Sequence, residues 1–512
     1  MTLAVDLIRR GAALHADRIA VRYGDDRLTF REVNEAANRF AAVFAELGIV
    51  KGTHLAILSG NGLWTVAVDF ACMKAGIVRV PLNARLSVTE HKRMIDGTRA
   101  QFLLHDAALT EPAEQLRGLV DGLIVIGLGA SAAGGGIDLL DTAENASTDE
   151  PHVEVAADDP VLLLHTSGTT GVLKAATHTQ ASWAGITRNI LSNLISPAPD
   201  SVMLHAASMI HASGTFVLPY WVRGGTTAIL DKFEPEGFLQ AIERYRATEI
   251  NLVPTMIGML FASPALDSAD VSSLRTVIYG ASPMPRPLIR QAMDRWGSIF
   301  VQYYGQTEIP LALTVLTKED HQDPSLLGSC GQPCVDADIR LIGDDGTPVE
   351  PGRIGEFQAR MPSRMLGYHN AAELNAEMIT EDGWIRTRDM AYVDERGYYH
   401  LVDRSSDMIV SGGYNVYPRE VEDALSEHPA VAECAVVGAP DPLWVEAVTA
   451  FVAFRPGMHA TEKELQQTVR GRLAGYKVPK RIHVTDTIPK SAVGKILRRA
   501  LREPLWSREV QA

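Results

Sequence analysis

The chain has 512 residues, a length that predicts two or three structural units with separate cores. Its 48 lysines and arginines against 62 aspartates and glutamates give a formal net charge of −14, which argues against a nucleic-acid-binding protein and a polybasic membrane anchor. Hydrophobic residues at 46% and charged residues at 21% are typical of a globular protein and exclude disorder, collagen and coiled coil.

The N-terminal part of the chain alternates between helical and strand patterns. Apolar positions recur at helical spacing over 30–46 and 66–75, and short apolar runs at 55–58 and 78–81 predict buried strands. This alternation indicates an α/β architecture with mostly parallel strands. A glycine-rich tract at 127–136 loosely fits a dinucleotide-binding fingerprint, but its consecutive glycines would break the helix that such a site requires, so we interpret it as a surface linker.

An apolar strand predicted at 161–164 runs directly into a loop of hydroxyl groups and glycines. Such groups can surround a polyphosphate, and the lysine that closes the loop adds positive charge. The alternatives are an ordinary Ser/Thr turn and a Walker loop; Leu173 and Ala175 on either side of Lys174 replace the glycine and the Mg²⁺-holding hydroxyl of a Walker loop. We predict a phosphate-binding loop made by Thr166, Ser167, Gly168, Thr169, Thr170, Gly171 and Lys174.

A second polar loop, at 304–308, follows a strand predicted at 300–303. Tyr304 offers a ring for stacking on adenine, Gly305 permits close approach, and Gln306, Thr307 and Glu308 add polar groups suited to phosphate and Mg²⁺. This five-residue pattern is weak alone and informative together with the first loop.

The pattern changes near residue 400. A strand at 408–410, a Gly412-Gly413 turn, a helix at 418–426, a strand at 431–437 and a helix at 462–473 precede a basic stretch at 477–502. This stretch has about a hundred residues, which is enough for a separate C-terminal domain.

These two loops, together with 384–389, 403–415 and 489–495, resemble in order and spacing the adenylate-forming superfamily of acyl-CoA synthetases, adenylation domains and luciferases, most closely its acyl- and aryl-CoA ligases. The resemblance implies an α/β fold with an α+β C-terminal part. It implies a large N-terminal domain at 1–404, made of β-sheets flanked by helices, and a small mobile C-terminal domain at 405–512 with its hinge near Ser406.

The resemblance also implies the positions of the ATP site. The loop from Thr166 to Lys174 would hold the β- and γ-phosphates, with Thr307 at the α-phosphate and Glu308 and Thr170 at Mg²⁺. Gly280, Ala281 and Ser282 would enclose adenine with Tyr304, beside Gly305 and Gln306. Asp389 would bind the ribose hydroxyls next to Arg404.

For the reaction itself, the resemblance implies Lys495, His211 and Thr307 as catalytic residues, with Lys495 reaching the reacting carboxylate. Gly412 and Gly413 would line the path of CoA, and Trp444 and Lys480 would meet its nucleotide. For Trp444, an indole packed against its own domain is an equally good interpretation.

His211 stands where amino-acid-activating relatives carry an aspartate. Without that carboxylate, a bound amino acid would bury an unpaired ammonium group, which costs several kcal/mol. Ile210, Gly280, Ala281 and Gly305 indicate with His211 an apolar acid pocket with small walls. We therefore predict a ligase for a hydrophobic acid (aryl, fatty or bulky polycyclic) that uses ATP, Mg²⁺ and CoA and no redox cofactor.

Four residues depart from the family pattern: Leu173 replaces a proline, Arg388 and Val445 replace glycines, and Ser406 occupies the hinge position. Arg388 lies next to Asp389, where it would pair with that carboxylate or crowd the nucleotide. Neutral drift in a working ligase is the simpler interpretation. The alternatives are a ligase impaired in adenylation that thioesterifies a supplied acyl-adenylate, a luciferase-like oxygenase, and a nucleotide-binding relative without activity.

The four cysteines, Cys72, Cys330, Cys334 and Cys434, have neither disulfide-framework nor zinc spacing, which predicts reduced thiols. Arginines occupy the start of the chain, and no apolar run approaches the ~18 residues of a spanning helix. We expect a cytoplasmic protein without a membrane span. The ligases that it resembles are commonly homodimers, which is the expectation here.

Overall fold

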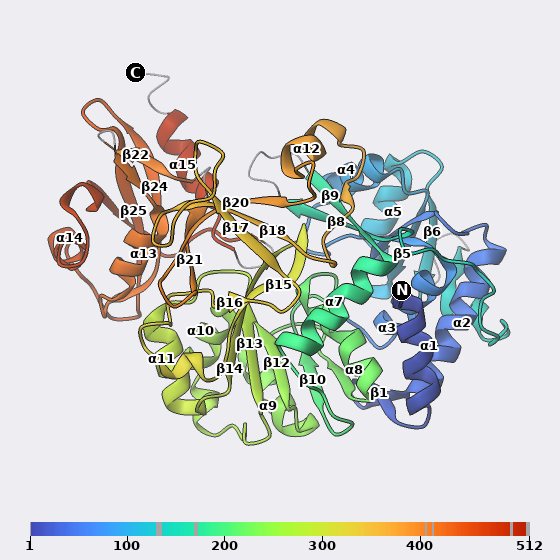
Figure 1. The fold of residues 1–512 in the computed structure, drawn as a ribbon. Coiled ribbons are helices and arrows are strands. Elements are labelled where there is room, and N and C mark those ends of the chain that lie inside the picture. The colour runs from blue at the N-terminus through green and yellow to red at the C-terminus, as the bar shows by residue number, and fades with distance from the viewer. Residues whose placement is uncertain are drawn as a thin grey trace.

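The computed structural model describes residues 2–129, 136–167, 173–404, 407–411, 414–491 and 495–507 (Figure 1). Within these ranges the chain builds three β-sheets before residue 405 and a further one after it. This arrangement confirms the expected mixed α/β fold with a large N-terminal part and a smaller C-terminal part.

The largest sheet has nine strands, and its central run from β1 to β14 is parallel. Its order is β16 (Gln332–Pro333), β15 (Ile309–Leu316), β14 (Phe300–Gln306), β13 (Thr276–Gly280), β12 (Glu249–Leu252), β10 (Val202–His205), β11 (Thr226–Ile229), β1 (Ile19–Tyr23) and β2 (Asp26–Thr29).

The second sheet has eight strands, with a parallel run from β8 to β7 and two antiparallel strands at one edge. Its order is β19 (Gly367–Tyr368), β9 (Leu173–Thr179), β8 (Pro160–Ser167), β4 (Val78–Pro81), β3 (His54–Leu58), β5 (Phe102–Asp106), β6 (Ile124–Leu128) and β7 (Ile137–Asp138).

The main core lies where these two sheets meet, because residues from both sheets and from the helices between them form one apolar cluster. Those helices are α1 (Ala4–His15), α2 (Phe30–Glu46), α3 (Thr65–Ala75), α6 (Leu139–Ala143), α7 (Gln180–Asn193) and α8 (Val217–Arg223). Separate clusters bury the faces that carry α4 (Val88–Thr98) and α5 (Thr110–Leu119) on the eight-stranded sheet, and α9 (Pro235–Tyr245), α10 (Pro254–Ala262) and α11 (Arg286–Trp296) on the nine-stranded sheet.

Two smaller sheets complete the fold. An antiparallel sheet contains β17 (Asp338–Ile342), β18 (Gly355–Arg360), β20 (Ile385–Val393) and β21 (Tyr399–Arg404), with α12 (Ala372–Met378) before β20. The C-terminal sheet lies apart from the large sheets (Figure 1) and contains β23 (Tyr414–Val416), β22 (Ile409–Ser411), β25 (Val445–Phe454), β24 (Val431–Asp441) and β26 (Arg481–Val484), with α13 (Pro418–Ser426), α14 (Glu462–Arg470) and α15 (Arg498–Ser507). Ser406 lies outside the described residues, so the domain boundary and hinge stay predictions.

Several predicted elements are confirmed at the residue level. Helix α2 begins and ends where the periodicity predicts, and its first turn is closed by a capping box in which Thr29 and Glu32 each accept a hydrogen bond from the other's backbone N–H. Helix α13 covers the predicted 418–426, with proline in its first turn. All four cysteines are buried free thiols. Among the described residues, no helix is both long and apolar enough to span a membrane.

Candidate active site

Strands β8 and β9 form an antiparallel pair that frames the predicted phosphate loop. Thr166 lies opposite Lys174 in their register, so the two ends of the loop meet. The side chain of Ser167 and all of Gly168, Thr169, Thr170 and Gly171 lie outside the described residues. The ammonium nitrogen of Lys174 lies 5.8 Å from the ring centroid of Tyr368 on β19.

Glu308 lies in the tight turn between β14 and β15, and neighbours from the eight-stranded sheet hold this turn. The hydroxyl of Tyr368 donates to Glu308 Oε1 at 2.5 Å, and the backbone N–H of Met365 donates to the Glu308 carbonyl at 2.8 Å. His178 Nε2 lies 2.9 Å from the carbonyl oxygen of Thr307. Burial lowers the pKa of His178 to about 4, so this imidazole is neutral and donates that hydrogen bond at neutral pH.

Asp389 is buried, and two residues of the β14 loop bind it. The Tyr304 hydroxyl and the Gln306 side-chain amide both donate to Asp389 Oδ2 at 2.6 Å. Burial, followed by the negative charge of Asp389, raises the pKa of Tyr304 well above its usual value. Asp389 also lies opposite Arg404 in the β20–β21 register, although the side chain of Arg404 is outside the described part. The fold thus brings together the predicted ribose and adenine residues.

Gly280 and Gly305 are required by close packing of the chain on itself. A Cβ atom at Gly280 would lie 2.5 Å from the Tyr303 carbonyl oxygen, and one at Gly305 would lie 2.0 Å from that of Leu311. Ala281 has a φ of 67°, and Ser282 beside it is half-buried. The role of these residues as walls of the acid pocket stays a prediction.

Arg388 is directed away from the nucleotide residues. Its guanidinium pairs with Glu377 on α12 at 2.5 Å, so the expectation that it pairs with Asp389 is wrong. The backbone explains the orientation, because Arg388 has a φ of 60° within β20, where the register with β18 shifts, and its side chain lies towards α12.

His211 precedes the short 3₁₀ turn Ala212–Phe216, which leads into α8. Its Nε2 lies 3.4 Å from the Asn83 side-chain nitrogen. Burial lowers the pKa of His211 to about 4, and the positive charge of Lys495 lowers it further. The predicted catalytic lysine of the C-terminal part therefore acts electrostatically on the predicted acid-binding loop.

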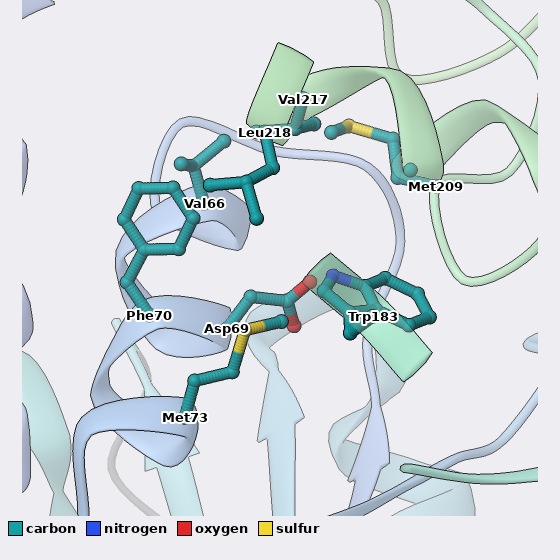
Figure 2. Close-up of a pocket in the computed structure, with 9 residues that line it drawn as sticks. Val66, Asp69, Phe70, Met73, Trp183, Met209, Val217 and Leu218 are labelled. Carbon is teal, nitrogen blue, oxygen red and sulfur yellow. The ribbon is translucent and has the colours of Figure 1, made fainter. Parts of the chain in front are cut away.

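A small cavity borders the His211 loop (Figure 2). It has about 10 Å³ of space for the centre of a water molecule, which is room for one water. Side chains from α3, α7 and α8 converge on it with Met209 and Gly214; the others are Val66, Asp69, Phe70, Met73, Trp183, Val217 and Leu218. Asp69 is its one charged lining residue and pairs with Arg79, which lies 5.4 Å from the Trp183 ring centroid. Ile210 is half-buried beside Met209.

The predicted CoA residues Trp444 and Lys480 lie together. The Lys480 ammonium nitrogen is 4.7 Å from the Trp444 ring centroid, and it donates to the carbonyls of Gly475, Tyr476 and Val478. Gly412 and Gly413 are outside the described residues. Ser411, which precedes them, lies opposite Val445 in the sheet, so Trp444 is close to the predicted CoA turn.

Neither Tyr368 nor His178 could be recognised as a site residue from the sequence alone. Each acts on a residue far away in the chain, and neither lies in a spaced motif with Thr307 or Glu308. The available signal is a polar residue on a strand next to the phosphate loop. Such residues are common in proteins, so the signal does not identify a site residue.

Comparison with known proteins agrees with this geometry. The family model described as AMP-binding enzyme matches residues 8–369, and the one described as AMP-binding enzyme C-terminal domain matches 420–495. The chain is 38% identical to a feruloyl-CoA synthase of Amycolatopsis sp, covering 96% of this chain and 97% of that protein. It is 35% identical to the medium/long-chain-fatty-acid–CoA ligase FadD8 of Mycobacterium tuberculosis, covering 96% and 88%.

Among solved structures, the fold is similar to o-succinylbenzoate CoA synthetase (MenE) from Bacillus subtilis in complex with its acyl-adenylate intermediate. The TM-score is 0.84 with 30% identity, and the match covers 97% of each chain. The chain belongs to the AMP-binding enzyme family, the adenylate-forming superfamily that its motifs indicate. Within that family it is an AMP-forming acid–CoA ligase.

Proposed function

We propose that this enzyme is a complete two-step ligase for a hydrophobic carboxylic acid. The carboxylate attacks the α-phosphate of ATP, which gives an acyl-adenylate and pyrophosphate, and the thiol of CoA then attacks the acyl carbon and releases AMP. The observation that carries this proposal is the cluster at Asp389, where Tyr304 and Gln306 both bind the buried carboxylate predicted to hold the ribose. The positive charge of Lys495, which lowers the pKa of His211, supports the adenylation step.

In the first step the chain would position two reactants and balance charge. Lys174 and the phosphate loop would hold the polyphosphate, and Asp389 would hold the ribose, its orientation fixed by Tyr304 and Gln306. Lys495 would offset the negative charge that develops between the carboxylate and the α-phosphate. His211 is neutral at pH 7, so it can approach the acid without adding a second cation.

The residues at the β14–β15 turn fit Mg²⁺. Glu308 supplies the hard carboxylate oxygens that Mg²⁺ prefers, and the hydrogen bond from Tyr368 orients one of them. When bound, the ion would neutralise charge on the phosphates.

The hydrophobic class of acid is supported by the His211 loop. His211 and the neighbouring Met209 and Ile210 offer an ammonium group no carboxylate partner. The relatives named for ferulic acid and for medium- and long-chain fatty acids indicate an aryl or a fatty acid.

The orientation of Arg388 supports an intact adenylation step. The alternative of an impaired ligase depended on two changes on the ATP side, at Leu173 and Arg388. Arg388 is paired with Glu377 instead of Asp389, and the side chain of Leu173 lies outside the described residues. We retain the proposed domains, 1–404 and 405–512, as the units that alternate between the two steps.

The test follows each half-reaction separately. The protein is incubated with ATP, Mg²⁺ and a panel of aryl and fatty acids while pyrophosphate release is measured; in parallel, synthetic acyl-adenylates and CoA are supplied and the thioester is measured by mass. We expect pyrophosphate and thioester with at least one acid. Thioester from adenylate without pyrophosphate from any acid would establish the impaired ligase, and oxygen consumption with an adenylate would establish the luciferase-like reaction.

A lysine substitution adds a specific prediction. Lys495→Ala should lower the rate of pyrophosphate release by about 10²-fold or more, since a preorganised charge at the transition state is lost. Thioester formation from supplied adenylate should stay within about threefold of wild type. An equal loss in both half-reactions would contradict the role assigned to Lys495.

A further inference from the structure

Arg498 begins α15 and makes a set of ion pairs that the reaction scheme does not use. Its guanidinium contacts Glu422 at 2.7 and 3.1 Å, Asp407 at 3.3 Å and Asp403 at 3.4 Å. The Arg498 side chain is only 19% exposed, and those of Glu422 and Asp403 are 10% and 4% exposed. A buried guanidinium with three carboxylate partners is far from the ordinary surface ion pair, whose contribution is small.

The three carboxylates belong to both sides of the predicted hinge. Asp403 lies on β21 of the antiparallel sheet, before residues 405–406, whereas Asp407 follows them and Glu422 lies on α13. Asp403 Oδ2 also accepts a hydrogen bond from the backbone N–H of Arg419 at 2.9 Å. Asp403 therefore binds the C-terminal domain at two places, through the backbone of Arg419 and the side chain of Arg498.

The same arginine is linked to the predicted catalytic lysine through a short stretch of backbone. Lys490 and Ile496 form an antiparallel bridge, and the N–H of Leu497 donates to the Pro489 carbonyl at 2.9 Å. Lys495 therefore lies directly before a bridged segment that leads into Arg498. At the other end, Lys490 pairs with Glu433 on β24 at 2.5 Å. The ion pairs that hold Arg498 therefore also restrain the neighbouring segment that carries Lys495.

We propose that Arg498 is a positioning residue for adenylation: by bridging Asp403 to Glu422 and Asp407 across the hinge, it holds the C-terminal domain in the orientation that presents Lys495 to His211. This inference rests on the proposed two-step function. In the second step the Arg498–Asp403 contact would break, while the pairs with Glu422 and Asp407 would move with the C-terminal domain.

The test measures both half-reactions in Arg498→Gln and Arg498→Lys. In Arg498→Gln we expect kcat for pyrophosphate release to fall about tenfold or more, with KM for ATP within about threefold, because the ATP site itself is intact. Thioester formation from supplied adenylate should be unchanged or faster. Arg498→Lys should recover part of the loss, since it keeps the charge but not the planar guanidinium that reaches several carboxylates. Arg499→Gln is the matched control, because its partner Glu503 lies on the same exposed helix, and it should leave both rates unchanged.

A second variant guards against simple unfolding of the C-terminal domain. Asp403→Asn keeps an oxygen that can accept from the Arg419 N–H but removes the charge that attracts Arg498, so it weakens the Arg498–Asp403 pair and leaves the hydrogen bond from Arg419 in place. We expect it to reproduce the selective loss of pyrophosphate release. Equal losses in both half-reactions for Arg498→Gln, or an unchanged adenylation rate in Asp403→Asn, would overturn the proposal. A wild-type protein that releases no pyrophosphate with any acid would instead overturn the proposed function.

Discussion

Val445 and Arg388 adopt the left-handed backbone conformation, with φ of 66° and 60°. This conformation brings Cβ close to the carbonyl oxygen and costs roughly 1–2 kcal/mol for an L-residue, more for a β-branched one. Glycine pays no such cost, which gives a physical reason for glycine at both positions in the family pattern. In this chain the replacement of glycine by Val445 and by Arg388 therefore strains the backbone at both positions.

Replacing Val445 with glycine should stabilise the C-terminal domain. Val445 is 70% exposed, so little apolar burial is lost and the strain of its positive φ is removed. We expect the free energy of unfolding to rise by about 1 kcal/mol, measured as an increase in Tm or in the urea midpoint. Val484→Gly is the matched control, since Val484 is 65% exposed in an ordinary strand and its replacement should lower stability. A lower Tm for Val445→Gly would show that the φ is not strained.

Replacing Arg388 with glycine tests whether this cation affects ATP. Because Arg388 pairs with Glu377, we expect Arg388→Gly to change the rate of pyrophosphate release and KM for ATP by less than about twofold. Glu377→Gln serves as the control that removes only the ion pair. A large gain in adenylation for Arg388→Gly alone would mean that the cation does crowd the nucleotide.

At the scale of elements, the β14–β15 turn is held by β9 and β19 in addition to the pairing of its own strands. His178 binds the carbonyl of Thr307 and Tyr368 binds the carboxylate of Glu308. We expect Tyr368→Phe to raise the Mg²⁺ concentration needed for half-maximal pyrophosphate release several-fold, because a charged hydrogen bond worth about 1.5–3 kcal/mol no longer orients Glu308. Tyr392→Phe, on β20 and stacked on His400, should leave this requirement unchanged. An unaltered Mg²⁺ profile in Tyr368→Phe would show that Glu308 needs no orienting partner.

Sequence reasoning was most successful where a local rule determines the structure. The helical spacing of apolar residues in α2 and the short apolar run of β4 are local patterns, and the predicted bounds of α2, β4 and α13 agree with the structure. The site residues on the two polar loops could be named because their chemistry is concentrated in short motifs. The partners of those residues could not be named, because Tyr368, His178 and Arg498 come into contact with them only in the folded chain, where distant segments lie together. The direction of Arg388 depends on one φ angle, which the sequence does not specify.

At the scale of the whole molecule, four histidines, of which His178 and His205 are buried and His165 and His211 half-buried, couple the active-site region to pH. Burial lowers the pKa of His165, His178 and His211 to about 4 and that of His205 to about 3, from an ordinary value near 6.5. His165 lies on β8 before the phosphate loop, His178 holds Thr307, and His205 Nδ1 lies 2.9 Å from the hydroxyl oxygen of Ser213 behind the His211 turn. Protonating the folded protein would therefore place charges at the junction between the sheets where the site is built.

The sign of the pH dependence follows from proton binding. Between pH 6.5 and about 4 the unfolded chain protonates these histidines and the folded chain does not, so the stabilisation present above pH 6.5 is lost as the pH falls through this window. Each histidine contributes up to about 1.4 kcal/mol per pH unit there.

We expect the free energy of unfolding to fall steeply from pH 6.5 to 4.5, measured by urea titration at each pH. His205→Asn, which preserves a donor towards Ser213, should make this fall less steep, whereas His152→Asn at an exposed position should not. Equal slopes in wild type and His205→Asn would mean that His205 is protonated within the fold, and that acid sensitivity arises elsewhere in the molecule.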